Sequence, residues 1–114
     1  MASFPTGPIA EEHELIAVFG VVPDDARPHS GFSSFTKTMN PHLSLQFSFD
    51  LMQASVQTRI TVNGRAVSTV AREGLDSIVV SECGRRVRVT FRNDNTVLCL
   101  QLGENVSVEW STLI

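Results

Sequence analysis

Tyrosine is absent from this chain of 114 residues, and tryptophan occurs only once. Aromatic side chains are enriched in many binding surfaces and commonly stack on sugars, so the composition argues against a sugar site. No apolar run approaches the ~20 residues that a membrane-spanning helix needs. The first residues also lack the basic and apolar regions of a signal peptide. These absences predict a soluble protein of the cytoplasm with no transmembrane segment.

Cysteine is scarce as well, with only Cys83 and Cys99. No CxxC pair and no Cys/His cluster has the spacing of a metal site. The strand register given below places Cys99 opposite Arg88 and Cys83 in a turn, so the two cysteines are not cross-strand partners. We therefore expect free thiols, which agrees with a reducing compartment.

Catalytic motifs are missing too. The three histidines, His13, His29 and His42, have no partner in a recognisable motif, and the glutamates around His13 fit a solvated turn better than a metal site. The segment 30–34 does not have the spacing of a nucleophile elbow, and there is no glycine-rich phosphate loop. The sequence predicts a protein that is not an enzyme and that holds no metal or cofactor.

Positive charge is limited, because nine Lys and Arg stand against twelve Asp and Glu, which gives a net charge of −3. Phosphate binding usually needs a positive surplus, so this balance argues against a nucleic-acid partner. The exception is an arginine cluster formed by Arg85, Arg86, Arg88 and Arg92. Three of these share the outward face of a predicted strand. We take the arginine cluster as the candidate interaction surface, with an ordinary solvated strand face as the alternative.

The length fits one domain. Residues 1–10 are rich in Pro and Gly and predict a flexible N-terminal arm, and residues 11–114 form the single domain. Glu14–Val22 is apolar on both faces, which predicts a strand covered on each side. The Glu-Glu-His-Glu run of residues 11–14 could start a short helix, but Pro23 stops a long one. Residues 23–42 predict a long connecting loop with one short strand at Phe32–Thr36.

Apolar and polar residues alternate with period two from Ser77 to Thr112, which predicts a C-terminal β-meander with one buried face. Its turns keep all apolar residues on that face, and a one-residue slip would break the pattern. The predicted opposed pairs are Glu82–Arg85, Val80–Val87, Ile78–Val89, Phe91–Thr96, Val89–Leu98, Leu102–Val106 and Leu98–Trp110.

Two further segments predict strands. Leu43–Leu51 alternates in the same way, and Val56–Val62 leads into Asn63-Gly64, a strong hairpin signal that sets Ile60 opposite Val67. The total is about eight strands and almost no helix, and one sheet of that size would leave an apolar face exposed. We therefore predict an all-β antiparallel sandwich, with a partly closed barrel as the alternative.

Apolar residues in the N-terminal part exceed what one sheet face needs. These are Phe4, Ile9, Ile16, Val18 and Val22. A second copy could cover them by edge pairing or across a two-fold axis. The sequence thus predicts a non-enzymatic protein-interaction or assembly module, an accessory or structural protein, that self-associates as a homodimer. The alternative is a sandwich or barrel that binds a small apolar ligand or lipid between its sheets.

Overall fold

Nine strands and one helix make up the computed structural model, which describes residues 5, 7–27, 29, 31–81, 85–92, 95–103 and 106–112. The elements are α1 (Glu12–Phe19), β1 (Asp25–Arg27), β2 (Phe32–Asn40), β3 (Leu43–Asp50), β4 (Ser55–Val62), β5 (Arg65–Glu73), β6 (Leu75–Ser81), β7 (Arg86–Phe91), β8 (Thr96–Leu102) and β9 (Val106–Thr112).

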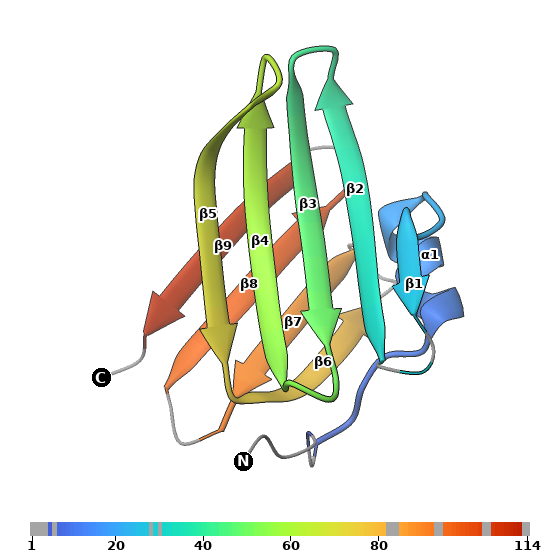
Figure 1. Cartoon of the computed structure of the whole chain (residues 1–114), viewed down its shortest axis with the longest axis vertical. Coiled ribbons are helices and arrows are strands. Elements are labelled where there is room, and N and C mark those ends of the chain that lie inside the picture. Colours follow the sequence, from blue (N-terminus) through green and yellow to red (C-terminus); the bar gives the residue numbers. More distant parts are fainter. Residues whose placement is uncertain are drawn as a thin grey trace.

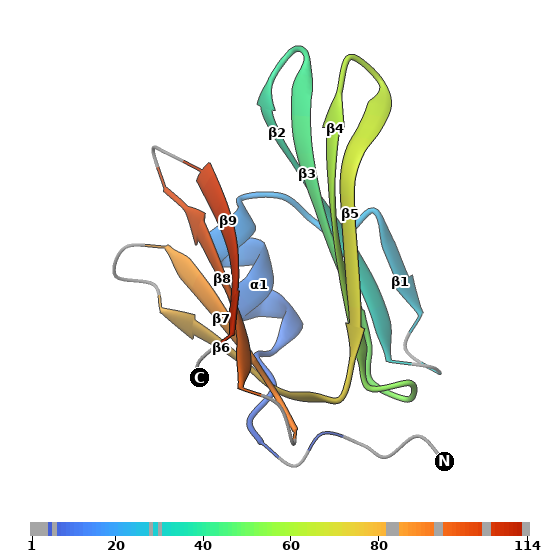
Figure 2. The same ribbon diagram turned by 90° about the vertical axis from the view of Figure 1, so that its left-hand side faces the viewer.

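The strands form two facing antiparallel sheets (Figure 1). The first sheet has the order β1-β2-β3-β4-β5 and the second the order β6-β7-β8-β9. This confirms the all-β sandwich, and the described strands do not close into a barrel. Gly74 is the one residue between β5 and β6, and its φ of 89° suits glycine where the chain passes from one sheet to the other (Figure 2).

The predicted register of the second sheet is confirmed at five of the predicted pairs, whereas the β7–β8 pairing ends at Thr90 opposite Val97, one residue before the predicted Phe91–Thr96 pair. Val80 lies opposite Val87, Val89 opposite Leu98, and Leu98 opposite Trp110. The predicted Glu82–Arg85 pair and the Cys83-Gly84 turn lie outside the described residues. The meander therefore follows from its period-two pattern, because a slip of one residue would turn its apolar side chains outward.

In the first sheet, one predicted pair is wrong. Ile60 lies opposite Ser68 and not Val67, because a bulge between Ile60 and Thr61 leaves Val67 as the extra residue of β5. The Asn63-Gly64 turn itself is as predicted, with φ of 51° and 79° at the two positions. The short strand predicted at Phe32–Thr36 is confirmed as the first part of β2, but the rest of the loop predicted over residues 23–42 is wrong, since β2 continues to Asn40 and β1 also lies there. Pro23 and Pro41 fall outside these strands, where they remove no ladder hydrogen bond.

The segment predicted as a strand from Glu14 begins instead as the helix α1. Its first turn carries a capping box, in which the backbone N–H of Glu11 donates to Glu14 Oε1 at 3.0 Å. The helix ends at Gly20, whose φ of 74° forms a left-handed cap, three residues before Pro23. Leu15, Val18 and Phe19 are buried, so the apolar residues of this segment form the buried face of a helix.

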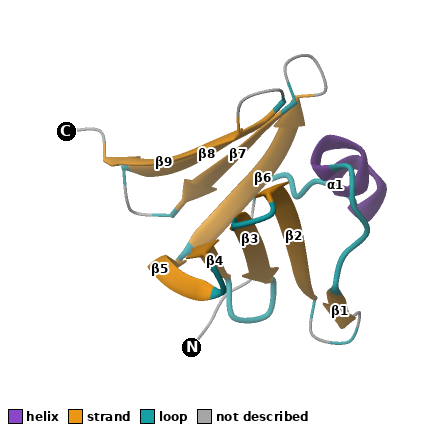
Figure 3. Cartoon of the chain, turned by 90° about the horizontal axis from the view of Figure 1, so that it is seen from above, coloured by secondary structure: helices purple, strands orange, loops and turns teal. Residues whose placement is uncertain are grey.

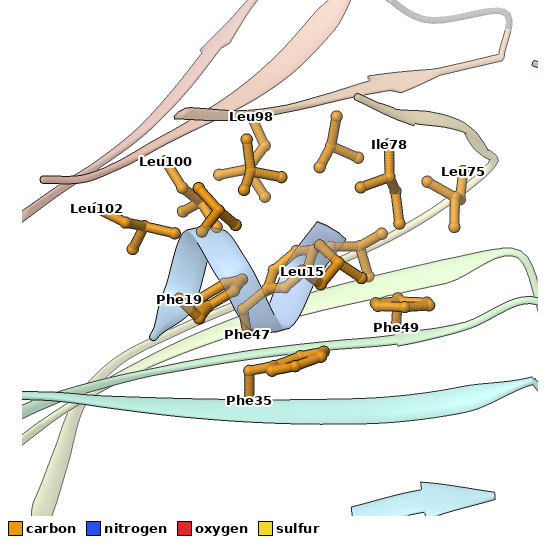
Figure 4. Packing of buried hydrophobic residues seen from close by; sticks show 14 of the residues in the cluster. Leu15, Phe19, Phe35, Phe47, Phe49, Leu75, Ile78, Leu98, Leu100 and Leu102 are labelled. Atoms are coloured by element: carbon orange, nitrogen blue, oxygen red, sulfur yellow. The ribbon is translucent and has the colours of Figure 1, made fainter. Parts of the chain in front are cut away.

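The helix fills the space between the two sheets on the side of β2 and β6 (Figure 3). The Phe19 ring stacks on Phe35 of β2 at a centroid distance of 5.0 Å and on Phe47 of β3 at 5.7 Å (Figure 4). The second sheet adds a layer of aliphatic side chains from β6 and β8, namely Ile78, Leu98, Leu100 and Leu102. The protein's own helix thus occupies the place where the sequence suggested an apolar ligand.

This packing removes much of the argument for a second copy at the N-terminal part. Val18 is only 2% exposed inside its own chain, and Ile9 and Ile16 pack partly against the core. Val22 remains exposed, and Phe4 lies outside the described residues. The surplus of apolar residues reflects a helix that the period-two analysis missed.

Residues 7–10, part of the predicted arm, run along β6. The N–H of Gly7 donates to Asp76 O at 3.0 Å, and Ile9 forms a parallel bridge with Ile78. At the other side of the sandwich, Trp110 of β9 stacks on Phe91 and its Nε1 donates to Thr58 Oγ1 of β4 at 2.9 Å. The bond from Trp110 to Thr58 therefore ties the two sheets together at this side.

Candidate protein interface

The outer face of the second sheet, turned away from the first sheet, is hollowed. The hollow has a volume of about 560 Å³ and crosses all four strands from β6 to β9. We call it the outer hollow. Its lining residues are Val79, Ser81, Arg86, Val87, Arg88, Val97, Cys99, Leu100, Gln101, Ser107, Glu109 and Ser111.

The register arranges most of these residues in rows across the sheet. The middle row runs Val79, Arg88, Cys99, Glu109 from β6 to β9. The next row runs Ser81, Arg86, Gln101, Ser107. Each arginine therefore has uncharged residues directly opposite it on both neighbouring strands.

The outer hollow combines apolar surface with charge. Val79 is 46% exposed although it lies within β6. Arg86, Arg88 and Glu109 are exposed, and Glu109 lies two strands from Arg88, about 10 Å at the usual strand spacing. Within the described part of the chain, none of these three side chains has an ion pair. Their charges are thus available to a partner.

The arginine cluster predicted from the sequence is divided by the structure. Arg86 and Arg88 lie in the outer hollow. Arg92 lies after β7, with its Nε 3.9 Å from Asp76 Oδ1 and its side chain 28% exposed. Arg85 points to the helix, and its Nε and Nη2 donate to Val18 O at 3.2 and 2.9 Å.

Arg85 has a helix-capping role that the sequence analysis missed. It binds a carbonyl in the last turn of α1, where the helix dipole favours a cation. Lys37 of β2 binds the next carbonyl, with Nζ 3.0 Å from Phe19 O. Two cations, one from the first sheet and one beside the second, thus hold the same end of α1.

Replacing Arg85 with alanine is therefore expected to lower the free energy of unfolding by about 1–2 kcal/mol, since it leaves the Val18 carbonyl without its charged donor. Arg86→Ala and Arg88→Ala are the matched controls, with expected changes within about 0.5 kcal/mol because both side chains are exposed. Urea unfolding of the three variants measures the difference. Equal losses in all three would contradict the assignment of Arg85 to the helix.

The outer face of the first sheet is different in character. Small polar residues dominate it, and they bond to one another near β1. Thr36 Oγ1 and Ser34 Oγ donate to Asp24 Oδ2 at 3.2 and 3.4 Å, and Gln46 Nε2 donates to Ser34 Oγ at 3.1 Å. A hollow at one end of this sheet has about 170 Å³. The outer hollow of the second sheet is therefore the better candidate for a binding face.

Other candidate chemistry from the sequence stays dispersed. His13 Nδ1 lies 3.2 Å from Glu11 Oε2, and both side chains are about three-quarters exposed (76% and 73%). The described residues contain no group of three or more His, Cys, Asp and Glu that could hold a metal ion. Their one helix is too short to span a membrane.

Much of the outer hollow could be foreseen from the strand register. The register predicted an outward face formed by Arg86, Arg88, Arg92, Cys99, Gln101 and Glu109, and the structure brings all of these except Arg92 together in the outer hollow. Val79 and Val97 were missed. The available signal was that Val79 stands between Ile78 and Val80, so in a strand it must point away from both.

Comparison with known proteins gives one similarity in fold. No family model matches the chain, and no curated protein matches its sequence. A chain of the contact-dependent growth inhibition toxin–immunity protein complex from Klebsiella pneumoniae 342 has a similar structure, with a TM-score of 0.81 and 16% sequence identity. The match covers 97% of this chain and 100% of that one. The two proteins share a fold over nearly their whole length.

Proposed function

We propose that this chain is a non-enzymatic protein-binding module of the immunity type, which binds a toxin protein through the outer hollow of its second sheet. The observation that carries this proposal is the outer hollow itself, where exposed Val79 lies beside Arg88 and Arg86, and neither arginine has an ion pair within the described part of the chain. Apolar surface provides affinity, and charges of this kind select the partner.

The similar fold supports the same proposal, because that protein comes from a toxin–immunity complex. We assign this chain the immunity role because of its surface. The described residues form a broad hollow, and their titratable side chains are dispersed and do not gather in one cluster. We also place its action in the cytoplasm, in agreement with an exposed free thiol at Cys99.

Charge reversal in the outer hollow should weaken partner binding. The double variant Arg86→Glu/Arg88→Glu is expected to lose about 10- to 100-fold in affinity, as is common for arginines at the centre of an interface. The matched control is Arg59→Glu/Arg65→Glu, on β4 and at the start of β5 in the first sheet. Both double variants should unfold at nearly the same urea concentration as the parent chain.

The partner must first be identified. A photo-crosslinking amino acid at position 79, in cells of the source organism, marks proteins that touch the outer hollow, and the same amino acid at Gln57 of the first sheet is the control. Isothermal titration calorimetry with the purified crosslinked protein then measures the affinities. Growth arrest on expression of that protein, relieved by co-expression of this chain, is the expected result. A partner whose expression does not arrest growth would contradict the proposal. Equal affinity of both double variants for the partner would contradict it as well.

Self-association is a second candidate activity, because one sheet edge favours it. Among the described strands, β9 has a neighbour on one side only and carries neither a bulge nor a proline. A small apolar ligand is disfavoured, since α1 places Leu15, Val18 and Phe19 between the sheets.

A further inference from the structure

The free edge of β9 differs from the other three sheet edges. Natural proteins protect edge strands by shortening them, covering them, or adding charges and bulges. β6 is covered by residues 7–10, with Ala10 N donating to Ile78 O at 2.8 Å and Ile78 N donating to Pro8 O at 2.9 Å. β1 has only three residues. β5 carries Arg65, Arg72 and Glu73 and contains a bulge.

Among the described residues, no segment covers the outer side of β9, and the strand is neither short nor bulged. Its seven residues pair with β8 in an uninterrupted register, from Thr112 opposite Thr96 to Val106 opposite Leu102. Its one charged residue is Glu109. Figure 3 shows β9 at the margin of the second sheet, on the opposite side of the molecule from α1. Such an edge is suited to pairing with another strand.

The sequence of β9 is complementary to itself. In an antiparallel pair about a two-fold axis through Val108, Ser107 faces Glu109 of the second copy and Val106 faces Trp110 of the second copy. Apolar side chains then meet on the inner face and polar side chains on the outer face. An axis through Glu109 keeps the same faces but sets Glu109 against its own copy, which is unfavourable.

We propose that β9 pairs antiparallel with β9 of a second copy of this chain, with Val108 at the two-fold axis. The two second sheets become one continuous sheet of eight strands, and the two outer hollows lie side by side on one face. This proposal does not depend on the toxin-binding function, because its evidence is the strand edge and not the arginines.

Two variants at one exposed position test the register. Ser107→Lys sets two lysines opposite two glutamates across the axis, and Ser107→Glu sets glutamate opposite glutamate. The first should tighten dimerisation and the second weaken it, each by roughly two- to thirtyfold. Ser107 is exposed on the outer face, so both variants should keep the stability of the parent chain. Sedimentation equilibrium from about 1 μM to about 1 mM measures the dissociation constants.

A disulfide test gives an independent readout. In a background with Cys83→Ser and Cys99→Ser, Val108→Cys should form a covalent dimer on mild oxidation, because the two copies of residue 108 face each other. Ser107→Cys is the control, since its two copies are offset along the strands beyond disulfide reach. A monomer at every concentration for both the parent chain and Ser107→Lys would overturn the proposal. Equal effects of the two Ser107 variants, or crosslinking of Ser107→Cys without Val108→Cys, would overturn it as well.

Discussion

Replacing Phe19 with alanine is expected to lower the free energy of unfolding by about 3–5 kcal/mol, the usual loss for a buried phenylalanine. The ring is fully buried and stacks on Phe35 and Phe47, so it joins α1 to two strands of the first sheet. Its removal leaves a cavity at the centre of the core. Aromatic contacts of this geometry add to the area that they bury.

Urea unfolding followed by circular dichroism measures this loss. Val22→Ala is the matched control, because Val22 lies just after the helix and is 71% exposed. Its expected change is within about 0.5 kcal/mol. A loss below about 1 kcal/mol for Phe19→Ala would show that α1 is not part of the core.

Replacing Gly31 with alanine is expected to cost about 2–4 kcal/mol, from backbone strain and overpacking together. Gly31 has a φ of 70°, which side-chain-bearing residues rarely adopt. An added Cβ would also lie only 2.8 Å from Leu51 Cβ, so the backbone or Leu51 must move. The Gly31 carbonyl accepts from Leu51 N at 3.1 Å, so such a shift would disturb that hydrogen bond.

Gly64→Ala separates the two causes. Its φ of 79° is close to that of Gly31, but an added Cβ meets no atom within 4 Å. This variant should therefore lose only the strain, about 1 kcal/mol. Thermal and urea unfolding of the two variants give the contribution of the contact with Leu51 by difference. Equal losses would mean that the approach of Leu51 has no energetic effect.

The second sheet could be predicted almost residue by residue because its strands are sequential neighbours and one face is apolar. The position of Val89 then fixes those of Leu98 and Trp110 through successive turns. The helix could not be predicted in this way. Its apolar run from Leu15 to Phe19 fits both the period of a helix and that of a strand. The signals that favour a helix are local, namely the Glu11–Glu14 capping box and Gly20.

Only the part of the candidate site that lies on one strand face could be predicted from the sequence. Arg86 and Arg88 share a face by alternation, so the sequence placed them correctly on the outer side. Arg85 and Arg92 depend on contacts with Val18 and Asp76, which are distant in the chain. Tertiary contacts of this kind leave no periodic signal.

Both sheets are built from strands that follow one another along the chain, so most strand pairing joins nearby residues. The N-terminal segment is the exception, because Gly7 bonds to Asp76 and Val18 to Arg85, at separations of 69 and 67 residues. Local contacts form quickly, whereas distant ones must first close a long loop. During synthesis on a ribosome, α1 can therefore meet Phe35 and Phe47 of the first sheet early. Its contacts with the second sheet form only after β6 and Arg85 have followed.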